Sequence, residues 1–343
     1  MVDLNALAAD VQQNCHISDA LFARDYSLCI YLLKMREYFR WEKGYRYGDA
    51  LPDQELGEWL VAREQLWQGL EEEPYGTLLL GDTRFDPFSS DAINAALVPQ
   101  GFVYSGGYGG GSKPHFFLAQ FERELKEPAL HVLITGRELA RDLTAPPAMT
   151  QGETIYVRRE SLRRMLWERL EEWRWRKQEG PMARVARHYA FDTRFDAALD
   201  ALTEVEIDSV VWHERGERQI GMEVGPAWEE MLASVARTRT EYTLRAIRDH
   251  AADCAVTLPQ LIAQENEAPL HFYFANLTGM RRAIFPSLWK AYERWCEESD
   301  RTPLLRAIQQ GERHWRATAL ELVGSYKERG REKLEETAAA VSL

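Results

Sequence analysis

Residues 160–176, ESLRRMLWERLEEWRWR, decide the structural class of this chain. Leu162, Leu166 and Leu170 recur every four residues, which is the spacing of one face of an α-helix. The same period continues toward the C-terminus. It predicts helices at 181–190, 204–222, 227–236, 240–256, 279–296 and 303–327. The second half of the chain is therefore predicted to be almost entirely helical.

A different pattern precedes this stretch, between residues 77 and 157. Short runs of aliphatic and aromatic residues alternate with Gly, Pro or Asp, which is typical of β-strands and turns. Strands are predicted at 77–80, 101–104, 115–121 and 130–135, and a short helix at 89–97. The fold class we predict is mainly α: a helical, bundle-like protein with an embedded small α+β segment whose sheet is antiparallel.

The N-terminal part is predicted to be helical as well. Its helices are expected at 3–13, 18–41 and 53–70. Ser18 and Asp19 are expected to begin the second helix, because a Ser side chain caps free N–H groups and an Asp side chain favours the positive helix end. TAPPAMTQG, at 144–152, is the predicted linker, since Pro146 and Pro147 cannot continue a helix. We expect an N-terminal domain at 1–150, a C-terminal helical domain at 151–330 and a tail at 331–343.

Composition and charge disfavour several classes of protein. A formal net charge of −12 over 343 residues disfavours general binding to nucleic acid or to an anionic membrane surface. The four cysteines form no CxxC pair, which is typical of reduced thiols. We find neither a secretory signal nor an apolar run of about 18 residues, the length of a membrane span. The expected compartment is the cytoplasm.

Two segments resemble a known group of proteins. HISDALFARDYSLCIYLLKMREYFRWE, at 16–42, and GRELARDLTAPPAM, at 136–149, resemble an uncharacterised bacterial protein family of unknown function. The resemblance implies a bacterial origin. It implies no particular activity, ligand or site.

Two predicted helices, within 205–221 and 241–256, each carry a histidine and carboxylates beside their apolar faces. These side chains are His213, Glu214, Glu217, His250 and Asp253. Helical bundles build di-metal sites from such residues, and imidazole with carboxylate suits Fe, Mn or Zn. We therefore predict that the five residues bind or surround a metal ion. Because neither Glu-x-x-His nor HExxH occurs in either helix, the alternative is that they form ordinary pairs on helix surfaces.

Asp25, Arg36 and Arg40 fall on the apolar stripe of the helix predicted at 18–41. That stripe, which is expected to be buried, is formed by Phe22, Cys29, Leu32 and Leu33. Buried charges are costly unless they are paired. The three charged residues are therefore expected either to shape a catalytic or anion-binding cavity, or to form ion pairs with other helices.

The segment SGGYGGGSKPHFF, at 105–117, has five glycines in six positions, followed by Lys113. Backbone N–H groups around Gly109, together with the charge of Lys113, predict a cradle for a phosphate or carboxylate of a cofactor or substrate. The Walker pattern is absent. The alternatives are a mobile lid over a site and a plain hairpin between two strands.

The helix that contains residues 158–177 combines an excess of positive charge with Trp167, Trp173 and Trp175. This combination predicts a surface that meets a protein partner, whereas the acidic chain as a whole disfavours nucleic acid. The alternative is a solvated helix face whose charges neutralise one another.

Three hypotheses of function follow. The leading one is a metal-dependent bacterial enzyme of the helical-bundle type that acts on a small molecule, with oxidative chemistry slightly favoured, an oxidoreductase by analogy of fold. The first alternative is a non-catalytic binding or scaffold protein. The second is a cofactor-free enzyme whose anionic substrate is bound by Arg36, Arg40 and Lys113.

Overall fold

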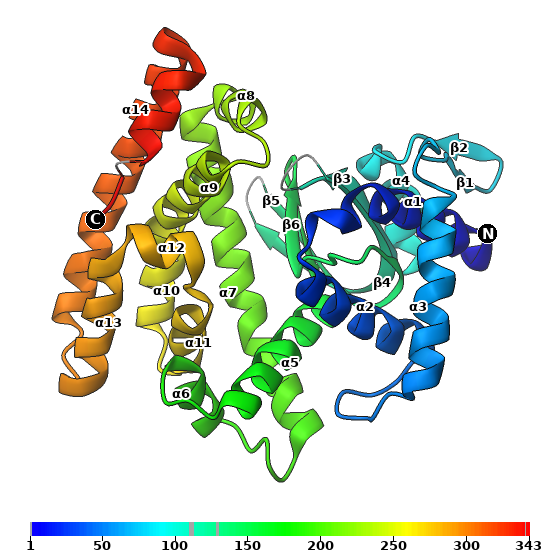
Figure 1. Cartoon of the computed structure of the whole chain (residues 1–343), viewed down its shortest axis with the longest axis horizontal. Helices are drawn as coiled ribbons and strands as arrows, with labels where there is room; N and C mark the ends of the chain where they lie inside the picture. Colours follow the sequence, from blue (N-terminus) through cyan, green and yellow to red (C-terminus); the bar gives the residue numbers. More distant parts are fainter. Residues whose placement is uncertain (1, 110–112, 128–129, 340) are drawn as a thin grey trace. The chain divides into compact units, whose positions relative to one another are not determined.

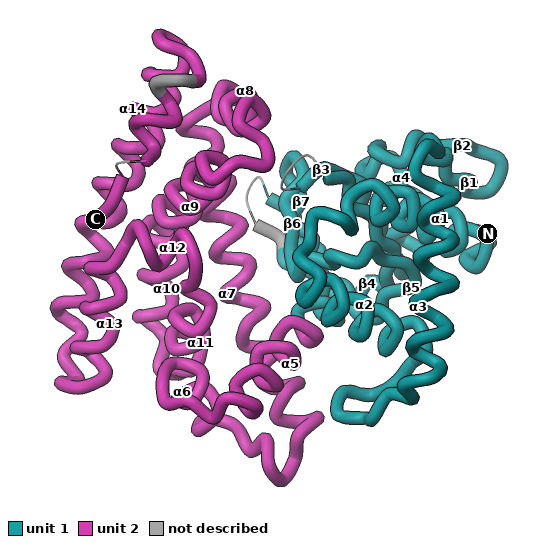
Figure 2. The backbone as a smooth tube through the Cα atoms, viewed as in Figure 1, with its two compact units in different colours: residues 1–162 teal, residues 163–343 magenta. Residues whose placement is uncertain are grey.

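The structure, a computed structural model, describes residues 2–109, 113–127, 130–339 and 341–343. The chain forms two compact units, Met1–Leu162 (unit 1) and Arg163–Leu343 (unit 2) (Figure 2). Most of the described residues lie in helices, so the prediction of a mainly helical protein is confirmed. Among the described helices, none combines the length and apolar composition needed to cross a membrane.

Unit 1 contains helices and two sheets (Figure 1). Its helices are α1 (Leu4–Phe22), α2 (Leu28–Lys43), α3 (Asp53–Gln68) and α4 (Ser90–Leu97). Its strands are β1 (Leu78–Leu80), β2 (Thr83–Phe85), β3 (Phe102–Tyr108), β4 (Pro114–Glu127), β5 (Leu130–Arg141), β6 (Ala148–Gln151) and β7 (Thr154–Arg158). The first two strands form a hairpin, and the other five form a sheet in the order β3–β4–β5–β7–β6.

The five-stranded sheet is mixed. β5 and β7 are parallel, whereas the remaining neighbours are antiparallel. The prediction of an antiparallel sheet is therefore wrong for this pair. A parallel pair requires a crossover connection, and here the crossover contains β6. The predicted linker at 144–152 is thus partly a strand of the sheet.

Helix α1 packs against β4 and β5. Leu7, Val11 and Cys15, one helical turn apart, are buried with Leu118 of β4 and Ala140 of β5. This apolar face continues past residue 13, where the sequence predicts the first helix to end. The continuing face explains why α1 reaches Phe22.

The predicted helix start at Ser18 is wrong. Ser18 and Asp19 lie inside α1 and are buried. Their side chains make tertiary contacts in place of capping: the Ser18 hydroxyl donates to the Pro114 carbonyl at 2.5 Å, and the Asp19 carboxylate accepts from Lys113 at 2.9 Å. Both side chains are therefore engaged in tertiary hydrogen bonds and do not cap the start of a helix.

The expected buried stripe of the second helix is also wrong. A short 3₁₀ turn, Ala23–Asp25, interrupts the predicted helix, and α2 starts anew at Leu28. Cys29 is exposed, and Leu32 and Leu33 are 45% and 54% exposed. The interruption rotates α2 so that another face, carrying Met35, Tyr38 and Phe39, is buried instead.

Every regular element that the structure describes in unit 2 is a helix or a helical turn (Figure 1). Its helices begin with α5 (Arg159–Arg176), which starts at the end of unit 1, and α6 (Pro181–Arg187). The others are α7 (Phe195–Val224), α8 (Ala227–Ser234), α9 (Arg239–Ala252), α10 (Leu258–Ala263), α11 (Ala268–Asn276), α12 (Gly279–Ile284), α13 (Pro286–Glu298) and α14 (Thr302–Ala339). A π-helical turn, Asp253–Thr257, joins α9 to α10.

Helix α9 lies among α7, α12 and α14. Its buried Leu244 and Ile247 belong to one large core that also contains Trp228 of α8 and Trp315 of α14. Beyond a kink at Gly330, α14 continues into the predicted tail and buries Leu334. The core therefore surrounds α9, and the candidate site lies on this helix and on the neighbouring α7.

Candidate metal centre

Helices α7 and α9 come unusually close at Gly216. A Cβ atom at Gly216 would lie 2.6 Å from the carbonyl oxygen of Ala252, so only glycine allows this approach. On α7, Glu217 directly follows Gly216, and His213 lies about one turn before it. Both side chains consequently meet acidic side chains at the end of α9. Two segments that are distant in sequence thus form one polar group.

His213 is oriented by a buried carboxylate. Its Nδ1 lies 2.8 Å from Oδ1 of Asp253, whose side chain is fully buried. When Nδ1 carries the proton and donates to Asp253, Nε2 is left as the free acceptor of the neutral ring. This Nε2 lies 3.6 Å from Oε1 of Glu217.

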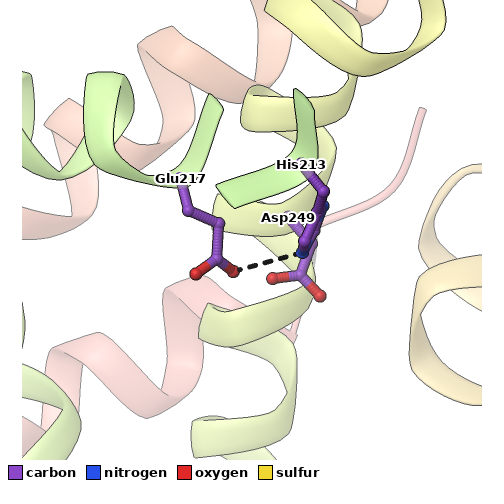
Figure 3. A group of neighbouring side chains, drawn as sticks. All are labelled: His213, Glu217 and Asp249. Atoms are coloured by element: carbon purple, nitrogen blue, oxygen red, sulfur yellow. Dashed lines mark ion pairs between the residues drawn. The ribbon is translucent and has the colours of Figure 1, made fainter. Parts of the chain in front are cut away.

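Asp249 adds a third side chain to the group. His213, Glu217 and Asp249 each offer one ligand atom, and these atoms lie within 4.8 Å of one another (Figure 3). All three side chains are partly open to solvent, with exposures of 30%, 23% and 22%. The arrangement can therefore be reached from outside, whereas its orienting residue Asp253 cannot.

Two arginines border the group. Arg248 contacts Oε2 of Glu217 at 3.0 Å and Glu229 at 3.3 Å. Arg281 binds the other oxygen of Asp253, and its Nε lies 3.8 Å from Asp249. Asp253 therefore sits between an imidazole and a guanidinium.

Tyr273 completes the shell around Asp253. Its hydroxyl donates to Oδ2 of Asp253 at 2.9 Å. Asp253 also opens the π-helical turn, and such turns occur frequently at functional sites. The buried carboxylate is thus held by three side chains and fixed in orientation.

The charges of the group shift its pKa values strongly. Burial lowers the pKa of His213, but Asp253 and Glu217 outweigh it and raise that pKa to about 10. Burial raises the pKa of Asp249 to about 7 against the opposing charge of Arg281. Burial would also raise the pKa of Glu217, yet Arg248 and His213 lower it to about 2. The group therefore holds extra protons on His213 and Asp249.

The structure separates the other two predicted ligands from this group. His250 is fully buried, its Nε2 donates to the Arg281 carbonyl at 2.8 Å, and its ring stacks on Trp315. Glu214 is half-buried and does not belong to the three-residue group. Asp249, which takes their place, was not singled out by sequence, although it lies one helical turn before Asp253.

The charged residues predicted in the N-terminal half do not converge on one cavity. Asp25 is exposed at the end of the 3₁₀ turn. Arg36 and the buried Arg40 both bind Glu37, at 2.8 and 3.1 Å. Arg40 also donates to the carbonyl of Arg46 at 2.5 Å. Both arginines therefore form ion pairs with a residue of α2 itself, whereas the alternative expected partners on other helices.

The glycine-rich segment begins in β3 and ends in β4, and these two strands pair antiparallel. Gly109 is described, but positions 110–112 of the predicted cradle lie outside the described residues. Lys113 is buried, and its ammonium binds Asp19 at 2.9 Å and the Thr144 hydroxyl at 3.0 Å. His115, next along β4, binds the buried Asp142 at 2.8 Å. The sequence singled out Asp19 only as a helix-start residue and did not single out Asp142.

The three tryptophans of α5 have different surroundings. Trp167 is buried, Trp173 is half-buried and donates to the Gln178 carbonyl at 3.1 Å, and Trp175 is 84% exposed. They therefore do not form one aromatic surface.

Comparison with known proteins adds the family. Residues 6–158 match the N-terminal domain, and residues 163–342 the C-terminal domain, of a family described as "Family of unknown function (DUF6866)". No curated protein and no solved structure shows a significant match to the chain. The resemblance to an uncharacterised family is thereby confirmed, and the chain belongs to the DUF6866 family.

Proposed function

We propose that unit 2 holds a divalent metal ion on His213, Glu217 and Asp249, and that the protein is a metal-dependent enzyme acting on a small molecule. The observation that carries the proposal is the convergence of three ligand atoms within 4.8 Å beside the buried Asp253. A carboxylate that fixes the far nitrogen of a ligating histidine is a recurrent feature of metal sites.

The balance of charge supports a cation at this position. Without the extra protons on His213 and Asp249, the carboxylates of Glu217, Asp249 and Asp253 supply three negative charges, whereas Arg248 and Arg281 supply two positive ones. The excess negative charge contributes to the raised pKa of His213, and the Glu217 charge adds to that of Asp249. A divalent ion would replace the protons on these two residues, because metal ligands bind in their deprotonated forms.

The spacing is also compatible with one ion. Oxygen and nitrogen ligands lie about 2.1 Å from Fe, Mn or Zn, so two ligand atoms of one ion are at most about 4.2 Å apart. The group therefore needs to contract by less than about 1 Å, which small side-chain rotations supply. Three protein ligands leave open positions for water or substrate.

The ligand set suits two kinds of chemistry. A metal-bound water becomes a nucleophile near neutral pH, whereas a redox-active ion supports oxidation. The helical-bundle analogy favours the oxidative reaction, and this part of the proposal rests on analogy alone. Arg248 and Arg281 would attract a negatively charged small substrate to the site.

Metal titration tests the centre. Chelator-treated wild-type protein is expected to bind about one Mn²⁺, Fe²⁺ or Zn²⁺ per chain in isothermal titration calorimetry. His213→Ala and Glu217→Gln should each weaken binding by at least about 100-fold, because each removes a ligand. Glu214→Gln is the matched control on the same helix and should bind as the wild type does.

Two outcomes contradict different parts of the proposal. Equal metal affinity in Glu217→Gln and Glu214→Gln places any ion elsewhere. A metal-loaded protein that neither consumes O₂ nor hydrolyses p-nitrophenyl acetate or phosphate above the level of His213→Ala contradicts the enzyme and leaves the metal centre intact.

The stability of the metal-free protein is expected to fall as the pH rises from about 6 to 10. The pKa of His213 is raised from 6.5 to about 10 in the folded state, so its contribution is complete below pH 6.5 and lost as the pH rises through 10. Asp249, raised from 3.8 to about 7, also favours its protonated form, and its contribution is lost as the pH rises through 7. Thermal melting in chelator between these pH values measures the decline.

His213→Gln is the control for this pH dependence. Glu206, a buried carboxyl whose pKa burial raises to about 8, contributes with the same sign and remains in the variant. The variant should therefore show a smaller decline than the wild type. Identical declines would show that His213 does not hold the extra proton. Metal affinity should rise over the same range, because the ligands lose their protons.

A further inference from the structure

Unit 2 also contains a cavity, which lies between the arginine-rich helix α5 and the helices α11 to α13. Its volume of about 650 Å³ lies within the range of small-molecule sites. The first wall is formed by α5, α6 and the segment between them, and the second by α11, α12 and α13 (Figure 1). Trp173 lines the first wall, so the cavity includes part of the sequence pattern that the metal centre does not use.

Aromatic rings line the second wall. Phe274 and Tyr292 stack with ring centroids 3.9 Å apart, and Trp289 lies 5.8 Å from Tyr292. Phe274 and Tyr292 are almost completely buried, whereas Trp289 is half-buried. The cavity therefore has a rigid apolar side against which a flat ring can pack.

Two guanidinium groups in the cavity have no carboxylate within ion-pair distance among the residues that the structure describes. Arg184 lies near the Tyr292 hydroxyl and the Cys296 thiol, where its charge acts on both groups. Arg282 stacks on the Trp289 ring at 3.7 Å. By contrast, Arg169 and Arg176, which line the same cavity, both pair with Glu172.

We infer that this cavity binds a small organic anion that carries a planar ring. Arg184 and Arg282 would bind the anionic group, since guanidinium recognises carboxylate and phosphate through paired hydrogen bonds. Trp289 and its aromatic neighbours would pack against the ring. The inference does not depend on the metal centre.

The acidic residues of the cavity limit the charge of the ligand. Glu293 accepts from the Trp289 indole at 2.7 Å, and the exposed Glu297 lies on the rim. Together with Glu172 and Glu179, which also line the cavity, these carboxylates repel an extended polyanion such as nucleic acid. They tolerate one compact anionic group placed against the guanidiniums.

Matched ligand pairs test the inference by isothermal titration calorimetry. The probes are adenosine 5′-monophosphate against adenosine, and indole-3-acetate against indole-3-acetamide, with inorganic phosphate as a ringless anion. At least one ring-bearing anion is expected to bind at least about tenfold more tightly than its neutral counterpart and than phosphate, as expected for a hydrogen bond to a charged group.

Two substitutions connect binding to the cavity. Arg184→Gln and Arg282→Gln should each weaken the anion by about tenfold or more, as a lost charge-assisted hydrogen bond does. Arg294→Gln is the control on α13, because Arg294 is exposed and pairs with Glu298, and neither residue lines the cavity. His213→Ala should leave anion binding unchanged. Arg282 is exposed, so its variant remains informative even where Arg184→Gln perturbs folding.

Three results would overturn the inference. One is the failure of both ring-bearing anions to bind. Another is equal affinity for a ring-bearing anion and its neutral counterpart, or for a ring-bearing anion and inorganic phosphate. The last is equal affinity in Arg282→Gln and Arg294→Gln, which would place the bound anion outside this cavity.

Discussion

Replacing Asp253 by alanine is expected to lower the free energy of unfolding by about 3 kcal/mol, the lower end of the range for breaking a buried ion pair. The carboxylate is fully buried and accepts from His213, Tyr273 and Arg281. Its removal leaves the Arg281 charge without its nearest partner. The lower end applies because the Arg281 side chain is 24% exposed and water offsets part of the loss. Urea unfolding measures the change.

Asp249→Asn is the matched control for this variant. Asp249 lies one turn before Asp253 but is 22% exposed, and burial has already raised its pKa to about 7. Its replacement should change the unfolding free energy by less than about 1 kcal/mol. Equal losses in the two variants would contradict the assignment of Asp253 as the buried residue that orients the site.

In unit 1, Glu138→Ala is expected to lower the free energy of unfolding by about 3–5 kcal/mol. The variant also breaks a buried ion pair, and here no solvent offsets the loss. Oε1 of Glu138 accepts from Arg158 at 2.8 Å and from Ser161 at 2.6 Å, and the side chains of the ion pair are fully buried. Neither Nη atom of Arg158 has a hydrogen-bond partner among the described residues. The variant therefore leaves a buried guanidinium that lies 4.4 Å from the centre of the Phe117 ring and has lost its Glu138 partner.

The double variant Glu138→Leu, Arg158→Met separates charge from packing. Replacing both members of a buried ion pair by apolar residues is often neutral or stabilising. Its unfolding free energy, measured in urea, should therefore lie closer to that of the wild type than to that of Glu138→Ala. Arg141, whose Nη1 lies 4.0 Å from Oε2 of Glu138, loses this contact in both variants. A double variant at least as unstable as Glu138→Ala would therefore show that the loss does not come from the unpaired charge of Arg158.

The helices of unit 2 could be predicted because each buries one face at a regular period. Periodicity places their ends less well. Residues 279–296 carry one continuous pattern, yet the structure divides them into α12 and α13 at Pro286. Proline has no backbone N–H and fits the first position of a helix, so it starts a new helix here. Apolar residues also recur with the helical period across the π-helical turn after Ala252, so the sequence does not reveal this turn.

Tertiary contacts explain the largest error in unit 1. Ser18 and Asp19 have the composition of a helix start, but both side chains bind groups on distant segments. Asp19 accepts from Lys113 and from the Leu143 backbone, and neither contact can be derived from local sequence. The error at Ser18 also led to the wrong face for α2, because a helix of unbroken phase places Leu32 and Leu33 inside.

The candidate site could be predicted only in part. A helical period shows which residues share a face, so it brought together His213 and Glu217 on one helix and His250 and Asp253 on the other. It does not show which neighbour a side chain meets across the interface. Asp253 turns to His213, whereas His250 stacks on Trp315 in the core. The close approach at Gly216, which decides the pairing of the helices, carries no signal in a single sequence.

The most direct test of the central claim is anomalous X-ray diffraction from crystals soaked with Mn²⁺. We expect an anomalous peak about 2.2 Å from a nitrogen of His213 and from carboxylate oxygens of Glu217 and Asp249. The peak should be absent from crystals of Glu217→Gln soaked in the same way. A wild-type crystal with no peak among these three side chains, or with its strongest peak on other residues, would contradict the account.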